Sequence, residues 1–153
     1  MTRQRNGFTI VELIVVISII AILAAVSIVM YSRVQGDARD TERASKVSII
    51  AGALEKYYSQ NGEYPGCSAM TQAGSLVTAN VLKGIELEAL LVPGSPAGVT
   101  NSITCSTLVG ASDAYRYVGD GTVPCNTGTA CTTFTLQYRR EVTNEIISVE
   151  GRH

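Results

Sequence analysis

The sequence has few of the residues from which active sites are usually built. Among its 153 residues there is one histidine, His153, at a chain end where a general base would lack fixed neighbours. It contains no Gly-x-Ser-x-Gly segment, which presents the serine nucleophile of many hydrolases, and no Walker motif for nucleotide binding. The sequence therefore predicts a protein that is not an enzyme and needs no cofactor.

Metal-binding patterns are equally scarce. The cysteines form no Cys-x-x-Cys pair, which argues against a zinc site. Asp113 and Asp120 lie near Gly119 and Gly121, and oxygen-rich loops are what calcium requires. Asp-Gly is, however, a common turn signal. We expect a turn at this place and no bound metal.

Charge of either sign is also sparse. Charged residues make up 16% of the chain, and the formal net charge is −1 at pH 7. This balance gives no indication of nucleic acid as an obligate partner. Four arginines could still form a local basic patch: Arg116, Arg139, Arg140 and Arg152. Solvated charges on strands are the simpler interpretation.

Cysteine is present in an even number, at Cys67, Cys105, Cys125 and Cys131. In an exported domain an even number favours two disulfides, and four cysteines allow three connectivities. We favour Cys67–Cys105 and Cys125–Cys131, the second of which would close a loop with five intervening residues.

One long hydrophobic run precedes all four cysteines. Residues 13–30 include two serines and no charged residue, and counting from Phe8 the run has 23 residues. At about 1.5 Å per residue this makes a helix about 35 Å long, enough to cross a bilayer. Arg3 and Arg5 favour a cytoplasmic leader, although Arg33 beyond the run reduces the asymmetry.

Glu12 is an unusual residue for the start of such a run. A carboxylate at the centre of a membrane helix disfavours insertion by roughly 2.5–3.5 kcal/mol, and near one end it still needs a reason. One reason is a favourable position at the positive end of the helix dipole. An ordinary secretory signal fits poorly, because its apolar core is usually about 7–15 residues and Ala25-Val26-Ser27 is a poor cleavage site. A plain, unprocessed membrane anchor is a second alternative.

The segment Arg5-Asn6-Gly7-Phe8-Thr9-Ile10-Val11-Glu12-Leu13 resembles the class III signal of type IV pilins and pseudopilins. The resemblance implies cleavage after Gly7 by a prepilin peptidase and N-methylation of the new terminus at Phe8. It also implies that Glu12 guides assembly, because the Phe8 amine of a neighbouring subunit can pair with this carboxylate. Residues 54–65, with their tyrosines and their Asn-Gly and Tyr-Pro steps, are similar to the end of the long pilin helix.

The sequence departs from many pilins inside the apolar run. Where those proteins carry a helix-breaking glycine and proline, this chain has Ala21 and Val29. Both residues are compatible with an unbroken helix. The partly unwound segment of pilin filaments is therefore in question for this chain.

The helical pattern continues beyond the apolar run. Apolar residues recur at three- and four-residue steps at Val47, Ile50, Leu54 and Tyr57. With Asn61-Gly62 and Pro65 as stop signals, we expect one helix from about Phe8 to Ser59. A short helix within residues 81–91 is expected to end before Pro93.

Strand patterns follow beyond residue 100. The candidate strands are Ala114–Val118, the alternating segment Phe134–Arg139 and Ile146–Val149, with Asn144 in the turn before the last. The expected fold class is α+β. A long N-terminal helix, its first half transmembrane or in a filament core, packs against a small antiparallel sheet.

Four parts are expected along the chain. They are a cleaved leader (1–7), a hydrophobic helix (8–31), the amphipathic half of the same helix (32–61) and a globular head (62–153).

The resemblance implies a structural subunit of a type IV pilus. Its precursor would cross the cytoplasmic membrane once, with the leader inside and the head outside, and then polymerise with itself into an extracellular filament. Its partners would be the prepilin peptidase, an assembly ATPase and a platform protein. The filament would serve motility, adhesion or DNA uptake, so nucleic acid stays open as a partner. The alternatives are a pseudopilin of a type II secretion system and a membrane-anchored binding module that does not polymerise.

Overall fold

The computed structural model describes residues 7–106, 114–120, 125 and 131–151. The chain divides into two compact units, residues 1–36 and 37–153, and each is described by itself. Helix α1 (Ile10–Asn61) contributes residues to both units. Its limits differ by two residues at each end from the predicted helix, Phe8 to Ser59.

In the first unit, α1 is an uninterrupted α-helix that includes Ala21 and Val29. Its large apolar side chains are exposed, from Ile10 at 78% to Val34 at 64%. α1 is also the one helix in the described part of the chain that is long and apolar enough to cross a membrane. Apolar surface of this extent requires lipid or other protein as a neighbour.

The two serines of the apolar run form hydrogen bonds within the helix. The Ser18 hydroxyl donates to the Ile14 carbonyl at 2.7 Å, and the Ser27 hydroxyl donates to the Leu23 carbonyl at 2.8 Å. Because a hydroxyl without a partner is costly to place in an apolar medium, these bonds remove an obstacle to burying the run.

In the second unit, the described residues form four strands, which pair into one sheet in the order β1-β2-β3-β4. They are β1 (Ile103–Thr104), β2 (Tyr115–Gly119), β3 (Phe134–Arg139) and β4 (Ile146–Glu150). β2, β3 and β4 are antiparallel, as predicted, and Asn144 in the β3–β4 turn has a φ of 59°.

The sheet is mixed, however, and the prediction of an antiparallel sheet is wrong for β1. This strand pairs in parallel with β2 through Ile103↔Tyr115 and Thr104↔Arg116. A parallel pair needs a crossover connection in place of a hairpin. β1 is held in this position by its neighbour Ser102, whose N–H donates to the Leu90 carbonyl and whose own carbonyl accepts from Tyr115 N–H, each at 2.9 Å.

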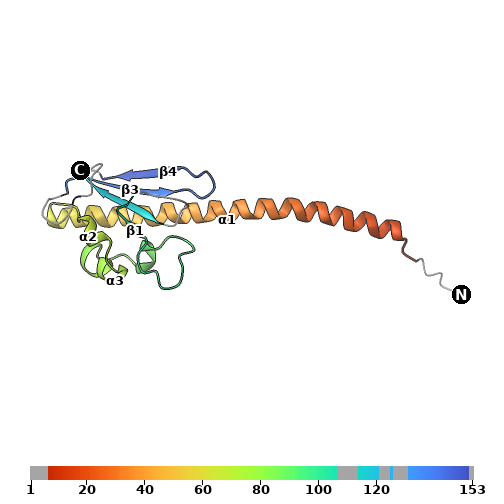
Figure 1. Cartoon of the computed structure of the whole chain (residues 1–153), viewed down its shortest axis with the longest axis horizontal. Helices are drawn as coiled ribbons and strands as arrows, with labels where there is room; N and C mark the ends of the chain where they lie inside the picture. The colour runs from red at the N-terminus through yellow and green to blue at the C-terminus, as the bar shows by residue number, and fades with distance from the viewer. Residues whose placement is uncertain (1–6, 107–113, 121–124, 126–130, 152–153) are drawn as a thin grey trace. The chain divides into compact units, whose positions relative to one another are not determined.

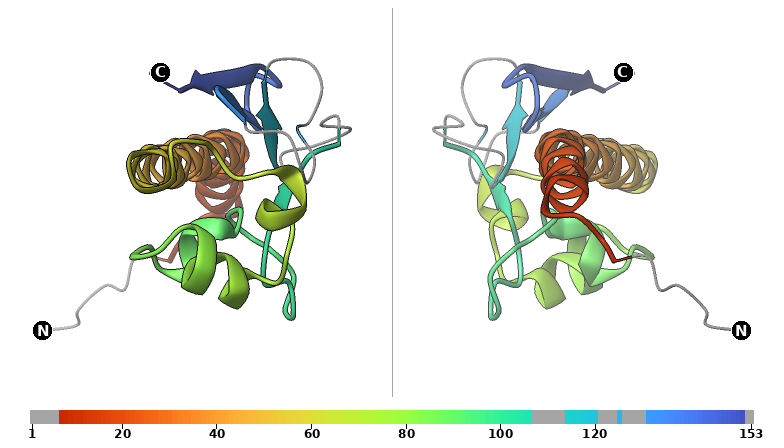
Figure 2. Two further views of the ribbon diagram at one scale, coloured as in Figure 1. Left: turned by 90° about the vertical axis from the view of Figure 1, so that its left-hand side faces the viewer. Right: turned by 90° about the vertical axis from the view of Figure 1, so that its right-hand side faces the viewer.

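The sheet packs on one side of α1, and the segment containing the short helices packs on another (Figures 1 and 2). The helix contributes the predicted apolar stripe, of which Val47, Ile50 and Leu54 are fully buried. β3 contributes Phe134, Leu136 and Tyr138, which alternate with half-buried residues along the strand. The core of the second unit therefore lies between α1 and the sheet.

α1 ends at Asn61, within the Asn61-Gly62 stop signal that the sequence predicts. Gly62 adopts a φ of +75°, a conformation that glycine reaches without strain, and its N–H donates to the Tyr58 carbonyl at 2.8 Å. Tyr64 then turns into the core, with its ring centroid 4.7 Å from that of Tyr58 and 4.9 Å from that of Phe134. Tyr58 and Tyr64 thus pack at the boundary between α1 and the sheet.

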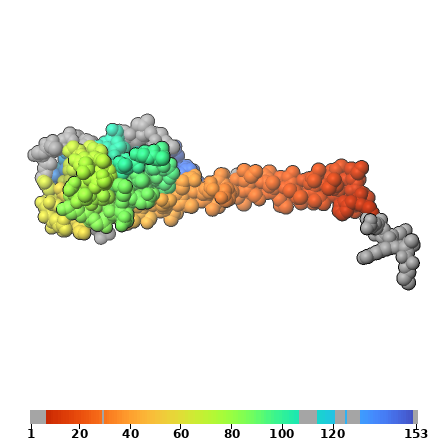
Figure 3. Space-filling model, turned by 90° about the horizontal axis from the view of Figure 1, so that it is seen from below, coloured from red at the N-terminus to blue at the C-terminus, as the bar shows by residue number. Residues whose placement is uncertain are grey.

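In the part of the chain that the structure describes, four short helical segments follow α1: α2 (Cys67–Met70), α3 (Gly74–Leu76), the π-helical turn η1 (Val77–Val81) and the 3₁₀ turn η2 (Leu87–Leu90). The predicted helix within residues 81–91 is wrong in its extent. Gly84 has a φ of +93°, which an α-helix cannot accommodate, so the chain forms separate turns on either side of it. Figure 3 shows this part of the chain, in yellow-green and green, on one face of the second unit.

The second unit contains two disulfides, Cys67–Cys105 and Cys125–Cys131, with Cα–Cα distances of 6.1 and 5.9 Å. They are the pairs that we favoured among the three connectivities. The first joins α2 to the residue that follows β1. The second lies against β2, where a Cβ on Gly119 would overlap the Cys125 sulfur. Glycine at position 119 is therefore a packing requirement of this disulfide.

The two disulfides should differ in their contribution to stability. Replacing Cys67 and Cys105 with alanine removes a link across 38 positions, and the expected loss is about 2–4 kcal/mol of unfolding free energy. Replacing Cys125 and Cys131 removes a link across 6 positions. Loop-closure entropy makes the second loss smaller by about 1.5 kcal/mol. Urea unfolding of the full chain in detergent, followed by tyrosine fluorescence, measures both, and equal losses would contradict the expectation.

Candidate functional site

Thr9 and Glu12 form a reciprocal capping box at the start of α1. The Thr9 backbone N–H and hydroxyl donate to Glu12 Oε2 at 2.9 and 2.8 Å. The Glu12 backbone N–H donates in return to Thr9 Oγ1 at 3.2 Å. These bonds satisfy donors that the first turn of a helix otherwise leaves without partners. We did not predict this role, although the Thr-x-x-Glu spacing is its usual signal.

Gly7 and Phe8 lie just before this capping box. Gly7 is exposed, and a Cβ added to it would meet nothing within 4 Å. Its backbone φ is also not positive, so its conformation is open to other residues. Neither packing nor conformation in this fold requires glycine at position 7. The Phe8 side chain is 80% exposed.

A second polar cluster joins α1 to the turn between β3 and β4. Asp40 Oδ1 accepts from Arg43 Nη1 at 2.7 Å and from the Glu141 N–H at 2.8 Å, and Asp40 Oδ2 accepts from the Val142 N–H at 3.3 Å. The Glu141 carboxylate also pairs with Arg39 and, at 3.2 Å, with Arg43. Asp40 and Arg43 are both buried. This cluster fixes the β3–β4 turn against the helix.

The same arginines control the titration of Glu141. Hydrogen bonding and charge from Arg39, followed by Arg43, lower the pKa of Glu141 to about 2. The ion pair in turn raises the pKa of Arg39. Glu141 and Arg39 are therefore both charged at neutral pH and paired with each other, as in a structural cluster. Among the described residues of this cluster, no carboxylate is left free to act as an acid or base.

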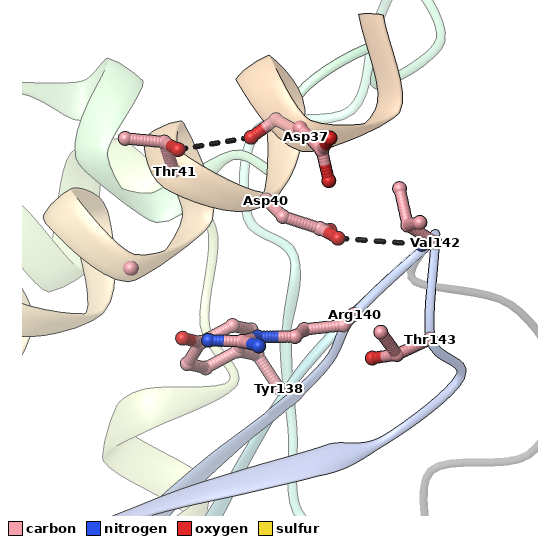
Figure 4. A pocket seen from close by; sticks show the side chains of 8 residues that line it. Asp37, Asp40, Thr41, Tyr138, Arg140, Val142 and Thr143 are labelled. Carbon is pink, nitrogen blue, oxygen red and sulfur yellow. Dashed lines mark hydrogen bonds between the residues drawn. The ribbon is translucent and has the colours of Figure 1, made fainter. Parts of the chain in front are cut away.

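A hollow of about 290 Å³ lies beside this cluster, between α1 and the β3–β4 turn (Figure 4). Its walls include Asp37, Asp40, Tyr138, Arg140 and Thr143. In Figure 4 Asp40 points to the Val142 backbone, whose N–H donates to its carboxylate. The hollow is open, and it offers no free buried carboxylate among its described lining residues, because Asp40 already accepts a hydrogen bond from the Glu141 N–H.

Asp120 acts in a turn, as predicted. It has a φ of 52°, and its Oδ1 accepts from the Thr132 N–H at 2.6 Å and from the Thr133 N–H at 3.0 Å. The bond from Thr133 is the main cause of its lowered pKa. Its carboxylate lies near Cys125 and Cys131, but their sulfurs form a disulfide and offer no thiolate to a metal. Asp113 and Gly121 lie outside the described residues.

The described arginines of the candidate basic patch each contact a different nearby side chain. Arg116 Nη1 donates to Gln137 Oε1 at 3.0 Å, and Arg139 Nη1 donates to Asn144 Oδ1 at 3.0 Å. Arg140 lies 4.0 Å from the Glu145 carboxylate. These contacts hold the three arginines within the sheet and its hairpin. Arg152 lies outside the described residues.

Comparison with protein families gives a match at the N-terminal end, and comparison with individual proteins gives longer ones. Residues 2–28 match the family model described as the prokaryotic N-terminal methylation motif. Fimbrial protein EcpC of Eikenella corrodens is 33% identical over 106 residues, which cover 69% of this chain and 65% of that protein. The type IV major pilin protein PilE of Neisseria gonorrhoeae is 30% identical over 90 residues, covering 58% of this chain and 54% of PilE.

A protein of another system is also similar. The type II secretion system core protein G of Pseudomonas aeruginosa is 36% identical over 63 residues, covering 41% of this chain and 44% of that protein. The chain thus spans about half to two thirds of the fimbrial relatives and less than half of the secretion protein. No solved structure matches significantly.

Proposed function

We propose that this chain, which belongs to the type IV pilin family, is a structural subunit of a type IV pilus. The observation that carries the proposal is the uncovered apolar part of α1, which has its single carboxylate, Glu12, five residues after Gly7. Such a helix is suited first to lipid and then to a bundle of identical helices. The family is a structural one, which favours a role without catalysis.

The proposed pathway begins with a precursor that spans the cytoplasmic membrane once, with its leader inside and its head outside. A prepilin peptidase cleaves after Gly7, and the new amine of Phe8 is methylated. An assembly ATPase and a platform protein then drive polymerisation, in which the Phe8 amine of one subunit pairs with Glu12 of another. Pairing opposite charges lowers the cost of burying each of them in an apolar bundle.

A pseudopilin of a type II secretion system is the second candidate, supported by the similarity to core protein G. The longer matches are to fimbrial proteins, which favours the pilus. Motility, adhesion and DNA uptake are the uses that we propose for such a filament.

Mass spectrometry of the chain from membranes and from sheared surface material tests the processing and the assembly together. We expect the surface form to begin at a methylated Phe8 and to be the main protein of filaments seen by electron microscopy. Retention of Met1 in the surface form, or cleavage after Ser27, would contradict the proposal. Detection only in membranes, in cells that secrete through a type II system, would favour the pseudopilin.

A further inference from the structure

A groove of about 440 Å³ lies in the second unit between α1 and the chain around η2. We call it the acidic groove. Its apolar lining is formed by Ile49 of α1 and by Ile85 and Ala89 of the facing segment. Three carboxylates border it: Glu42, Glu86 and Glu88. The groove thus combines an apolar floor with an acidic border.

Among the described residues, Lys46 is the one cation that lines the acidic groove, and it is already engaged. Lys46 Nζ donates to the Leu91 carbonyl at 3.0 Å and lies 2.8 Å from Glu42 and 3.4 Å from Glu88. Its side chain is 9% exposed, whereas those of Glu42 and Glu88 are 49% and 74% exposed. Lys46 therefore offsets one of the three carboxylates, and the exposed border of the groove keeps a surplus of negative charge.

Part of the apolar lining of the acidic groove, at Ile49, is left exposed to solvent. Ile49 is 46% exposed on α1, while its neighbours Val47 and Ile50 are fully buried. Covering it would remove apolar area from water, which favours association. The occupant that fits this surface is apolar and carries a positive charge.

A segment of this same chain has those properties. In the first unit, Met30, Tyr31 and Val34 are 66%, 67% and 64% exposed. Arg33 lies among them and is the one lysine or arginine in residues 7–36. It is exposed, and within the described residues it has no ion pair. Residues 30–34 thus offer apolar side chains and a free cation on one helical segment.

We infer that the acidic groove binds residues 30–34 of a second copy, with Arg33 of that copy between Glu42 and Glu86. This inference rests on the proposed function, because polymerisation is what brings the apolar helix of one copy against the head of another. Charge complementarity selects this occupant: the groove has more carboxylates than cations, and residues 7–36 offer Arg33 as their basic side chain.

Cysteine cross-linking in intact filaments tests the contact. The full chain carries Tyr31→Cys together with Ser45→Cys, which lines the acidic groove. Sheared filaments from these cells are expected to give a ladder of disulfide-linked multimers on non-reducing gels. The matched control pairs Tyr31→Cys with Ser75→Cys, an exposed position outside the groove, and should give monomers. Filaments that yield monomers from both pairs, or equal ladders from both, would overturn the inference.

A charge exchange tests the role of Arg33 separately. Arg33→Glu and Glu86→Arg should each lower the amount of sheared filament at least about tenfold, with unchanged membrane levels and leader processing. Combining the two should restore filaments to within about twofold of the original chain. Glu63→Arg, an equal charge change at an exposed residue outside the groove, is the control. Unchanged filaments in the single variants, or no recovery in the double variant, would reject the proposed pair.

The two failures are distinguishable. If the unsubstituted chain forms no filament at all, the proposed function fails. If it forms filaments and the acidic groove gives neither cross-links nor charge rescue, only the groove contact fails.

Discussion

Replacing Glu12 with glutamine is expected to leave α1 intact and to abolish filaments. Glutamine serves as well as glutamate at the third position of a capping box, so the bonds between Thr9 and residue 12 can persist. What the substitution removes is the negative charge. A methylated Phe8 amine would then enter the filament core without a counter-charge, at a cost of several kcal/mol. We expect normal processing and membrane levels, and loss of sheared filament, by immunoblotting.

Two further variants separate the charge of Glu12 from its capping role. Thr9→Ala removes the hydroxyl partner and keeps the carboxylate, at a cost of about 1 kcal/mol of helix stability, and should still assemble. Glu12→Ala removes both roles and should behave like Glu12→Gln in assembly. If Glu12→Gln assembles normally while Thr9→Ala and Glu12→Ala do not, then the capping box is the function of this residue and the charge pairing is refuted.

Replacing Asp40 with alanine is expected to cost about 3–5 kcal/mol of unfolding free energy, the range for breaking a buried ion pair. The substitution leaves the buried Arg43 guanidinium with Glu141 alone and removes the acceptor of two backbone N–H groups. The β3–β4 turn then loses its attachment to α1. Urea unfolding of the full chain in detergent, followed by tyrosine fluorescence, gives the change.

Asp37 provides a matched control for Asp40. It lies one turn earlier on α1, is exposed, and uses its backbone carbonyl to accept from the Thr41 hydroxyl. Asp37→Ala should change the unfolding free energy by no more than about 0.5 kcal/mol. Similar losses in both variants would show that Asp40 has no special role in the turn.

The polar cluster around Asp40 also predicts how acid affects the head. The pKa of Glu141 is about 2 in the folded chain, below the ordinary pKa of about 4.3 for an unfolded glutamate. Its contribution to stability is therefore present above about pH 4.3 and is lost as the pH falls towards about 2. Glu141→Gln should lack this part of the acid dependence.

The sequence predicted most of the secondary structure because local signals were strong. Gly62 ends α1 with the positive φ that its Asn-Gly step suggested, and the alternation in Phe134–Arg139 became the central strand. β1 could not be predicted, since two residues carry no periodicity and their pairing with β2 depends on Ser102 and Leu90. The turns around Gly84 were misread because apolar spacing alone suggested one helix.

The candidate sites also differ in whether the sequence could predict them. The junction at Gly7, Phe8 and Glu12 is readable because its residues are consecutive or one turn apart. The acidic groove is not, because Ile49 and Ile85 are brought together only by the packing of the chain around η2 on α1. The buried Asp40 likewise meets Glu141 across 101 positions of sequence.

The bonds of Ser18 and Ser27 to carbonyls of their own helix have a consequence for reversibility. A helix that carries all its hydrogen bonds within itself exchanges none of them when it leaves lipid for a protein bundle. In the proposed assembly, the balance between the two surroundings then depends on side-chain packing and on the ion pair between Phe8 and Glu12. Such a segment can be inserted, withdrawn and reused without being chemically altered.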